Sequence, residues 1–230
     1  MALIVPYLLA ANFARLGEQV ELMRSADATR LHLDVCDGHF APGITAGLPV
    51  IARLRKATDL ALDVHLRVER PERFIEDFAG AGVDSITVHP ESTADFHRVL
   101  RQIRSNGILT GAALNPATPV SAISEVAEDL DFLSLLSAGA GEQPYFQRTL
   151  QRVSAAVRLR RERGGRFILQ IEGDVDAEQV EALVGAGAGM VVLGAAIFAH
   201  SNPEGRLKHL MRSASQAGEK ITSRGSCHCE

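Results

Sequence analysis

The sequence alternates along almost its whole length between short apolar runs and longer segments whose apolar residues recur every three or four positions. Longer segments such as ARLGEQVELMRSA (14–26), PERFIEDFAGAG (71–82) and DFHRVLRQIRSNG (95–107) carry the single apolar stripe of an amphipathic helix. The short runs are rich in valine, isoleucine and leucine, which is typical of strands. They are LIVPYLLA (3–10), TRLHLDVC (29–36), LALDVHLRV (60–68), SITVHP (85–90), LTGAALNP (109–116), DFLSLLS (131–137), RFILQIEG (166–173) and MVVLGAAIF (190–198).

Eight strands alternating with helices predict one α/β domain whose parallel strands are joined by right-handed crossovers. Closing the eight strands on themselves gives a single-domain (β/α)8 TIM barrel, which is the fold we expect. The alternative is an open doubly wound sheet, but no GxGxxG motif follows the first apolar run. Gly82, Gly107 and either Gly185 or Gly187 follow helical segments, where a left-handed C-cap is often needed.

The length of 230 residues suits one barrel, and we expect the barrel domain to cover residues 1–212. Beyond about Leu210 the helical periodicity is lost, so residues 213–230 are expected to be a polar, disordered tail. Cys227, His228 and Cys229 could form a metal clip. We interpret them as part of the tail, because no second group of ligands pairs with them.

The composition excludes several classes of function. Acidic and basic residues are interspersed and the formal net charge is −4, which gives no reason to expect a nucleic-acid or membrane-surface partner. No apolar run approaches the roughly 18 residues needed to cross a bilayer. The apolar start (1–14) is predicted to be a first strand and not a signal peptide. The three cysteines are too few for a disulfide framework and indicate a reducing, cytoplasmic location.

Polar side chains on three predicted strands indicate where the chemistry lies. In a (β/α)8 barrel the active residues lie at the C-terminal ends of the strands, and residues two apart share a face. Polar residues share a face on the second, third and seventh strands: His32 and Asp34; Asp63, His65 and Arg67; and Gln170, Glu172 and Asp174. Buried polar groups are costly unless they are paired or bind a metal. Two imidazoles and two carboxylates meeting at one point would suit Zn²⁺, Fe²⁺, Mn²⁺ or Co²⁺.

Each of these residues also has an ordinary structural interpretation. A strand histidine such as His32 or His65 is more often a hydrogen-bonded structural residue than a metal ligand. Glu172 taken alone could be a solvated residue at the rim of the barrel. The occurrence of two imidazoles and two carboxylates at strand ends, all on the expected face, is what favours a functional site.

Several longer motifs carry a resemblance to a known family. They are HLDVCDGHFAPG (32–43), LDVHL (62–66), FIEDFAGAGVDSITVH (74–89), ALNPATP (113–119), NFARLGEQV (12–20) and GAAIF (194–198). Together these motifs resemble the ribulose-phosphate 3-epimerase family, and the resemblance runs from about Val5 to Met211.

The resemblance implies a metal-dependent isomerase of pentose phosphate metabolism, a carbohydrate epimerase that forms a homo-oligomer. One divalent ion (Zn, Fe, Mn or Co) would be held by His32, Asp34, His65 and Glu172. Asp34 and Glu172 would also be the catalytic acid and base. One would remove the proton at C3 of a ketose, and the other would return a proton to the opposite face, through a metal-stabilised cis-enediolate. An α-proton is weakly acidic, so the developing oxyanion needs the electrostatic stabilisation that a cation supplies.

The residues expected to contact a sugar or sugar phosphate depart in part from the family pattern. They are Tyr7, His65, Arg67, Gly139, Gly141, Gly173, Asp174, Gly194 and Ala195. The family has Asp-Gly-Gly where this chain has residues 172–174, and Gly-Ser where it has residues 194–195. Asp174 would bring a negative charge close to the substrate phosphate, which is unfavourable.

Other departures line the expected pocket. A family serine is Tyr7 here, and three methionines become Cys36, Arg67 and Leu136. The loop SAGAGEQPYF (137–146) is shorter than in the family but keeps two glycines. We expect the cysteine to be a packing residue. Arg67 could bind a substrate anion or, equally, it could pair with Asp174 or Glu69 or be a solvated residue at the rim of the barrel.

These departures leave three functional hypotheses. The first is a ribulose-5-phosphate/xylulose-5-phosphate 3-epimerase that tolerates the substitutions. The second is an epimerase or isomerase of a different sugar, carboxylated or without phosphate, because the phosphate-binding residues are altered. The third is a catalytically inactive barrel with a binding role. The four residues able to bind a metal favour the first two hypotheses over the third.

Overall fold

The computed structural model describes residues 2–137 and 143–225, and in them eight parallel strands form one sheet. The strands are β1 (Leu3–Pro6), β2 (Arg30–Cys36), β3 (Ala61–Arg67), β4 (Ser85–Val88), β5 (Leu109–Leu114), β6 (Phe132–Ser137), β7 (Ile168–Gly173) and β8 (Met190–Leu193). Strands β2 to β8 pair with one another in chain order, and β1 pairs with β8. A parallel bridge between Tyr7 and His32 joins β1 to β2 and closes the ring. The predicted (β/α)8 barrel is therefore confirmed, and the doubly wound sheet is excluded.

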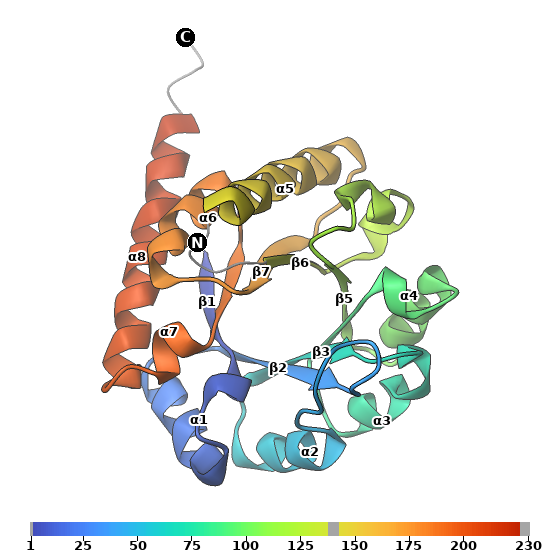
Figure 1. Cartoon of the computed structure of the whole chain (residues 1–230), viewed down its shortest axis with the longest axis horizontal. Coiled ribbons are helices and arrows are strands. Elements are labelled where there is room, and N and C mark those ends of the chain that lie inside the picture. Colours follow the sequence, from blue (N-terminus) through green and yellow to red (C-terminus); the bar gives the residue numbers. More distant parts are fainter. Residues whose placement is uncertain (1, 138–142, 226–230) are drawn as a thin grey trace.

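Helices surround the ring of strands (Figure 1). They are α1 (Leu16–Ser25), α2 (Leu48–Ala57), α3 (Ile75–Gly80), α4 (Phe96–Ser105), α5 (Gln143–Glu162), α6 (Val180–Ala186), α7 (Ala195–Phe198) and α8 (Pro203–Gly225). The segment between β5 and β6 is a 3-10 helix, Val120–Asp129. Among the glycines expected to end helices, Gly82, Gly107 and Gly187 have positive φ angles of 84°, 74° and 118°, so Gly187 and not Gly185 caps α6.

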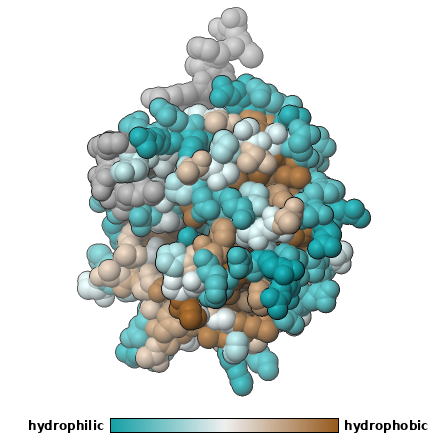
Figure 2. All heavy atoms as spheres, turned by 45° about the vertical axis from the view of Figure 1, so that its right-hand side comes forward, coloured by the Kyte–Doolittle hydropathy of each residue, from teal (hydrophilic) through white to brown (hydrophobic). Residues whose placement is uncertain are grey.

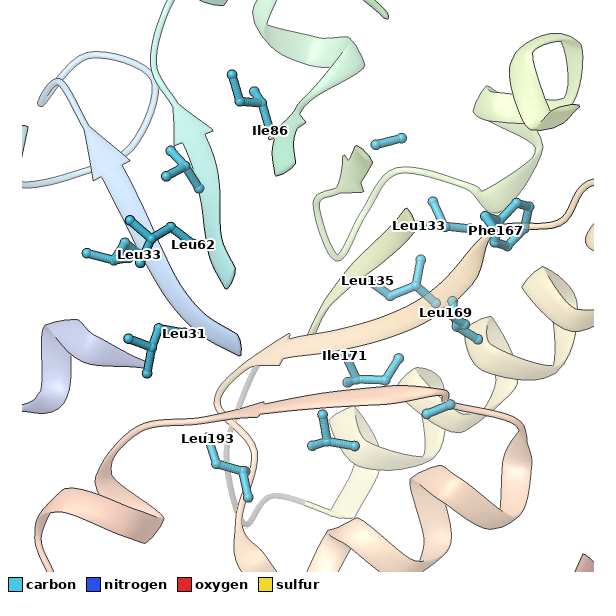
Figure 3. Close-up of a cluster of buried hydrophobic side chains, with 14 of the residues drawn as sticks. Leu31, Leu33, Leu62, Ile86, Leu133, Leu135, Phe167, Leu169, Ile171 and Leu193 are labelled. Carbon is cyan, nitrogen blue, oxygen red and sulfur yellow. The ribbon is translucent and has the colours of Figure 1, made fainter. Parts of the chain in front are cut away.

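The main apolar core lies between the strands and the helices. Alternate residues of each strand point outward, and leucines such as Leu33, Leu62 and Leu169 are fully buried there. Figure 3 shows this layer, with Leu169 and Ile171 of β7 close to the surrounding helices. The inward residues form a separate, smaller apolar cluster of Val5, Phe132, Met190 and Val192. The rest of the inward face is largely polar, and this leaves the barrel interior available for chemistry.

The last predicted strand is too long. β8 ends at Leu193, and GAAIF (194–198) is not strand: Gly194 accepts the first helical hydrogen bonds, from the backbone N–H groups of Ile197 and Phe198. The first run is also shorter than predicted, because a 3-10 turn, Leu8–Ala10, follows β1. A short apolar run has the same pattern in a buried strand and a buried helical turn, so periodicity alone could not separate them.

The prediction of a disordered C-terminal tail is also corrected by the structure. Helix α8 continues to Gly225, and Ala214 and Ala217 on it are buried. With Leu207 and Leu210 these alanines continue the helical spacing, but alanine is too small to give an apolar signal by itself. Residues 213–225 are therefore helical, and the prediction that they are disordered is wrong. The tripeptide 227–229 lies outside the described residues.

The surface has the mixed character expected from the composition. On the face shown in Figure 2, hydrophilic and hydrophobic residues are interspersed. Among the described residues, no helix combines the length and the apolar character that crossing a membrane requires.

Gly111 of β5 is expected to contribute to stability, because it faces Thr87 of β4 inside the barrel. A Cβ at this position would lie 2.1 Å from Thr87 Oγ1 and 2.9 Å from its Cβ. Such overpacking of a buried site typically costs about 1–3 kcal/mol. We expect Gly111→Ala to lower the free energy of unfolding by that amount, measured by urea denaturation. Gly185→Ala, which meets nothing within 4 Å, is the matched control. Equal midpoints for both variants would show that Thr87 moves aside freely.

Candidate active site and metal centre

Four inward-facing side chains meet at the C-terminal end of the barrel. His32 and Asp34 come from β2, His65 from β3 and Glu172 from β7, and all four are buried. Each offers one ligand atom, and these atoms lie within 4.8 Å of one another. We call these four residues the ligand cluster. The structure therefore brings together the four side chains that strand alternation placed on inward faces, and their role as metal ligands stays a prediction.

The spacing in the ligand cluster fits a small divalent cation. Nε2 of His32 lies 3.1 Å from Asp34 Oδ1 and 2.8 Å from Glu172 Oε2. Nδ1 of His65 lies 3.4 Å from Asp34 Oδ1 and 3.2 Å from Glu172 Oε1. Ligand atoms about 2.0–2.1 Å from a tetrahedral cation are about 3.3–3.4 Å apart. Nδ1 of His65 is also buried without a hydrogen bond, as expected of an atom directed at a metal.

A hydrogen-bond network orients His32 from behind. Its Nδ1 donates to Asp63 Oδ2 at 2.7 Å, so in the neutral ring that binds a metal the lone pair is on Nε2, which faces the ligand cluster. Asp63 also accepts from the Ser85 hydroxyl at 2.5 Å and from Gln170 Nε2 at 3.5 Å. A carboxylate behind a histidine is the usual support of a metal-binding imidazole. The inward polar residues Asp63 and Gln170, noted from the sequence, therefore support the ligand cluster.

Asp34 is held by two donors on its outer oxygen. Oδ2 accepts from Tyr7 Oη at 3.1 Å and from Arg67 Nη1 at 3.1 Å, while Oδ1 faces the imidazoles. The predicted partners of Arg67, Asp174 or Glu69, are therefore wrong. In the register of β2 and β3, Asp34 pairs with His65 and Cys36 pairs with Arg67. Arg67 is therefore one inward-facing position nearer the C-terminal end of the barrel than Asp34, and its guanidinium extends back to the carboxylate.

The ligand cluster is strongly polarised. Burial disfavours the charged form of both imidazoles, but the adjacent carboxylates outweigh it and raise the pKa of His65 to about 9 and that of His32 well above its usual value. Burial likewise opposes ionisation of the acids, but the imidazoles hold the pKa of Asp34 and Glu172 well below the usual range. Two imidazolium charges thus balance two carboxylates, and one divalent cation with two neutral imidazoles would give the same balance.

A cavity of about 220 Å³ opens over the ligand cluster. It is lined by Tyr7, Asp34, His65, Arg67, Leu136, Glu172, Gly173, Asp174, Val192 and Gly194. Most of the residues expected to contact substrate are therefore at the cavity. Ala195 is not among the lining residues, since it begins α7 and is exposed. Gly139 and Gly141 lie outside the described residues.

Sequence reasoning did not single out two residues that contact the ligand cluster. The Ser134 hydroxyl donates to Glu172 Oε1, and His89 Nε2 lies 2.9 Å from His65 Nε2. Both residues lie inside apolar runs whose pattern is interpreted only as strands. Strand alternation could have found them, because Ser134 shares a face with Leu136, and His89 follows the inward residues Ser85 and Thr87.

A family model and the sequences of individual relatives both match this chain to the same family. The model of the ribulose-phosphate 3 epimerase family matches residues 3–198. The ribulose-phosphate 3-epimerase of Bacillus subtilis is 37% identical over 205 residues, covering 88% of this chain and 94% of that protein. Those of Treponema pallidum and Escherichia coli K12 are both 39% identical. They cover 85% of this chain and 90% and 88% of the relatives.

Solved structures share the fold at low sequence identity. A mutant tryptophan synthase alpha-subunit from Pyrococcus furiosus superimposes with a TM-score of 0.68 at 17% identity, covering 93% of this chain and 97% of that one. Thiamine phosphate pyrophosphorylase from the same organism gives a TM-score of 0.64 at 14% identity, covering 94% and 96%. At these identities the two structures support the barrel architecture alone.

Proposed function

Since this chain belongs to the ribulose-phosphate 3-epimerase family, whose members are carbohydrate isomerases, we propose that its ligand cluster holds one divalent metal ion and that Asp34 and Glu172 move the proton at C3. The family makes the chain a pentose-phosphate 3-epimerase. A different sugar substrate and an inactive barrel are not favoured. The meeting of two imidazoles and two carboxylates beneath a cavity is the observation that carries the assignment of the site.

We infer that the two carboxylates flank the substrate and transfer protons at its opposite faces. Asp34 is on β2 and Glu172 is on β7, and β1 and β8 separate these strands in the ring. One carboxylate takes the proton from C3, and the other delivers a proton to the other face, so the centre inverts. The two exchange roles when the reaction runs backward. When bound, a divalent cation supplies Lewis-acid stabilisation of the negative charge that develops on the substrate oxygens.

Neighbouring side chains position the two carboxylates. Tyr7 and Arg67 fix the outer oxygen of Asp34, and Ser134 donates to Glu172. Glu172 is one methylene longer than the aspartate that the family resemblance implies at this position, and its carboxylate lies 2.8 Å from one imidazole and 3.2 Å from the other. We infer that glutamate performs the same step from this position.

Several finer assignments follow from the same reasoning. Two imidazoles with two carboxylates suit zinc, iron, manganese or cobalt, and metal analysis of purified protein identifies which is bound. We propose that the substrate is ribulose 5-phosphate or xylulose 5-phosphate and that the residues around Gly173 and Gly194 hold its phosphate. A homo-oligomer in the cytoplasm fits the family and the low cysteine count.

Deuterium uptake at C3 tests the proposed function directly. The metal-loaded protein is incubated in D₂O with ribulose 5-phosphate, with ribulose, and with a carboxylated ketose. We expect uptake with the sugar phosphate, accompanied by conversion to xylulose 5-phosphate. Uptake only with a ketose that lacks phosphate would contradict the proposed substrate. The absence of uptake from every ketose, with metal bound, would contradict the proposed activity.

Asp174 is expected to weaken binding of a phosphorylated substrate, because it is exposed at the edge of the cavity. Replacement by the isosteric asparagine removes one negative charge. An exposed charge interaction is worth about 1 kcal/mol or less, so we expect Asp174→Asn to lower KM for ribulose 5-phosphate by up to about fivefold. kcat should be nearly unchanged, and the gain should shrink at high salt. Glu178→Gln removes a nearby exposed charge outside the cavity and is the control. An unchanged or higher KM for Asp174→Asn would place the phosphate elsewhere.

A further inference from the structure

A row of three residues leads outward from the ligand cluster. The ring of His89, which follows β4, lies edge to edge with that of His65, with centroids 4.8 Å apart and planes at 27°. The two Nε2 atoms are 2.9 Å apart, and both side chains are fully buried. On the far side of the row, His89 Nδ1 lies 3.4 Å from Oε2 of Glu91, whose side chain is 26% exposed. Neither His89 nor Glu91 lines the cavity over the ligand cluster.

The direction of the hydrogen bond between the two imidazoles decides whether His65 can bind a metal. At 2.9 Å one Nε2 must carry the proton and the other must offer a lone pair. If His65 Nε2 carries the proton, its Nδ1 has a free lone pair directed at the ligand cluster. If His89 Nε2 carries the proton, a neutral His65 is protonated on Nδ1 and has no lone pair there.

Glu91 selects between these two directions. Its Oε1 accepts from the backbone N–H of Asn115 at 3.1 Å and from the hydroxyl of Thr118, and its Oε2 faces His89. The separation of 3.4 Å and its geometry make this an electrostatic contact, since His89 Nδ1 has no hydrogen bond. A carboxylate attracts a proton on Nδ1 and repels a lone pair, so it favours the form of His89 whose Nε2 accepts from His65.

We propose that Glu91 acts through His89 to hold His65 in the tautomer whose Nδ1 lone pair faces the metal ion. Glu91 and His89 are positioning residues, because neither is part of the ligand cluster and neither lines its cavity. The proposal rests on the proposed function, since it assumes that the ligand cluster binds a metal. It adds that two residues outside the ligand cluster set how strongly the metal ion is bound.

Substitution of Glu91 by glutamine is expected to reverse the direction of the hydrogen bond between His89 and His65. The backbone N–H of Asn115 can only donate, so the amide oxygen must take the place of Oε1, and the amide NH₂ then faces His89. This donor requires a lone pair on His89 Nδ1, which moves the proton to Nε2 and turns the hydrogen bond toward His65. Glu91→Ala removes the carboxylate but supplies no opposing donor. A purely structural role predicts that alanine is the more harmful change, whereas the proposal predicts that glutamine is.

The test measures Zn²⁺ dissociation constants by competition with a chromogenic chelator, together with thermal unfolding of each variant. We expect Glu91→Gln to bind Zn²⁺ about 10–100-fold more weakly than the wild type, with a smaller loss for Glu91→Ala. Thr118→Val removes a donor to the same carboxylate without changing its charge, and it should bind nearly as the wild type does. kcat at saturating Zn²⁺ should change little in all three variants.

Three outcomes separate the proposal from the function on which it rests. Wild-type affinity in Glu91→Gln, or weaker binding in Glu91→Ala than in Glu91→Gln, overturns the proposal and leaves the metal centre intact. Wild-type protein that binds no Zn²⁺, or that binds it equally well after His65→Ala, overturns the metal centre and the proposal together. Nitrogen-15 spectra of Zn²⁺-loaded wild type need no variant: His89 should be protonated on Nδ1, and protonation on Nε2 overturns the proposal.

Discussion

Replacing Glu172 with glutamine is expected to lower kcat for ribulose 5-phosphate epimerisation by about 10²–10⁴-fold, the usual contribution of a positioned acid or base. The amide keeps the size of the side chain and can accept the Ser134 hydrogen bond, but it cannot take up a proton. The measurement is a coupled assay at saturating metal, so that a weaker metal affinity does not limit the rate. Glu181→Gln, the same change on the exposed surface of α6, should retain the wild-type rate.

Isotope exchange shows which face each acid serves. With Glu172→Gln in D₂O, Asp34 can still remove and exchange the C3 proton of the epimer that presents it to β2, but the centre cannot invert. Exchange should therefore persist in one epimer and be lost in the other, and Asp34→Asn should show the opposite preference. Equal exchange of both epimers by Glu172→Gln, or turnover near the wild-type rate, would remove Glu172 from the proton-transfer step.

Removal of divalent ions is expected to abolish turnover. Without a cation the charge developing on the substrate loses a stabilisation of several kcal/mol, and a loss of about 4 kcal/mol lowers the rate about 10³-fold. Dialysis against a strong chelator followed by the coupled assay measures this loss. Zn²⁺, Fe²⁺, Mn²⁺ or Co²⁺ should restore the rate, whereas Mg²⁺ should not, because it prefers an octahedral set of oxygen ligands.

The chelation experiment needs a control for direct damage to the protein. The chelated sample should retain its helical circular dichroism and recover when metal is returned. Full activity in protein shown by metal analysis to contain no divalent ion would contradict a metal-dependent reaction.

Much of the fold could be predicted because strand alternation and helical period are properties of local sequence. The pattern predicts all eight strands, but it does not predict the ends of β1 and β8, because apolar residues continue from both strands into short helical turns. The predicted end of helix α8 is too early because the last buried residues of the helix are alanines. Boundaries of this kind depend on tertiary contacts, which single-residue hydrophobicity does not record.

The ligand cluster could be predicted because all four residues occupy strand positions whose side chains face into the barrel. The partner of Arg67 could not, because it depends on the register between β2 and β3, which places the arginine two residue pairs beyond Asp34, at the next inward-facing position. The contact between His65 and His89 also joins two strands and depends on ring orientation. Such contacts between strands become visible only when the barrel is closed.

An anomalous difference map from crystals of the catalytically active, metal-loaded protein would test the account most directly. We predict a single strong peak at the barrel mouth, about 2.0–2.2 Å from His32 Nε2, from His65 Nδ1 and from one carboxylate oxygen each of Asp34 and Glu172. A map from active crystals with no peak there, or with a metal that neither imidazole contacts, would contradict the account.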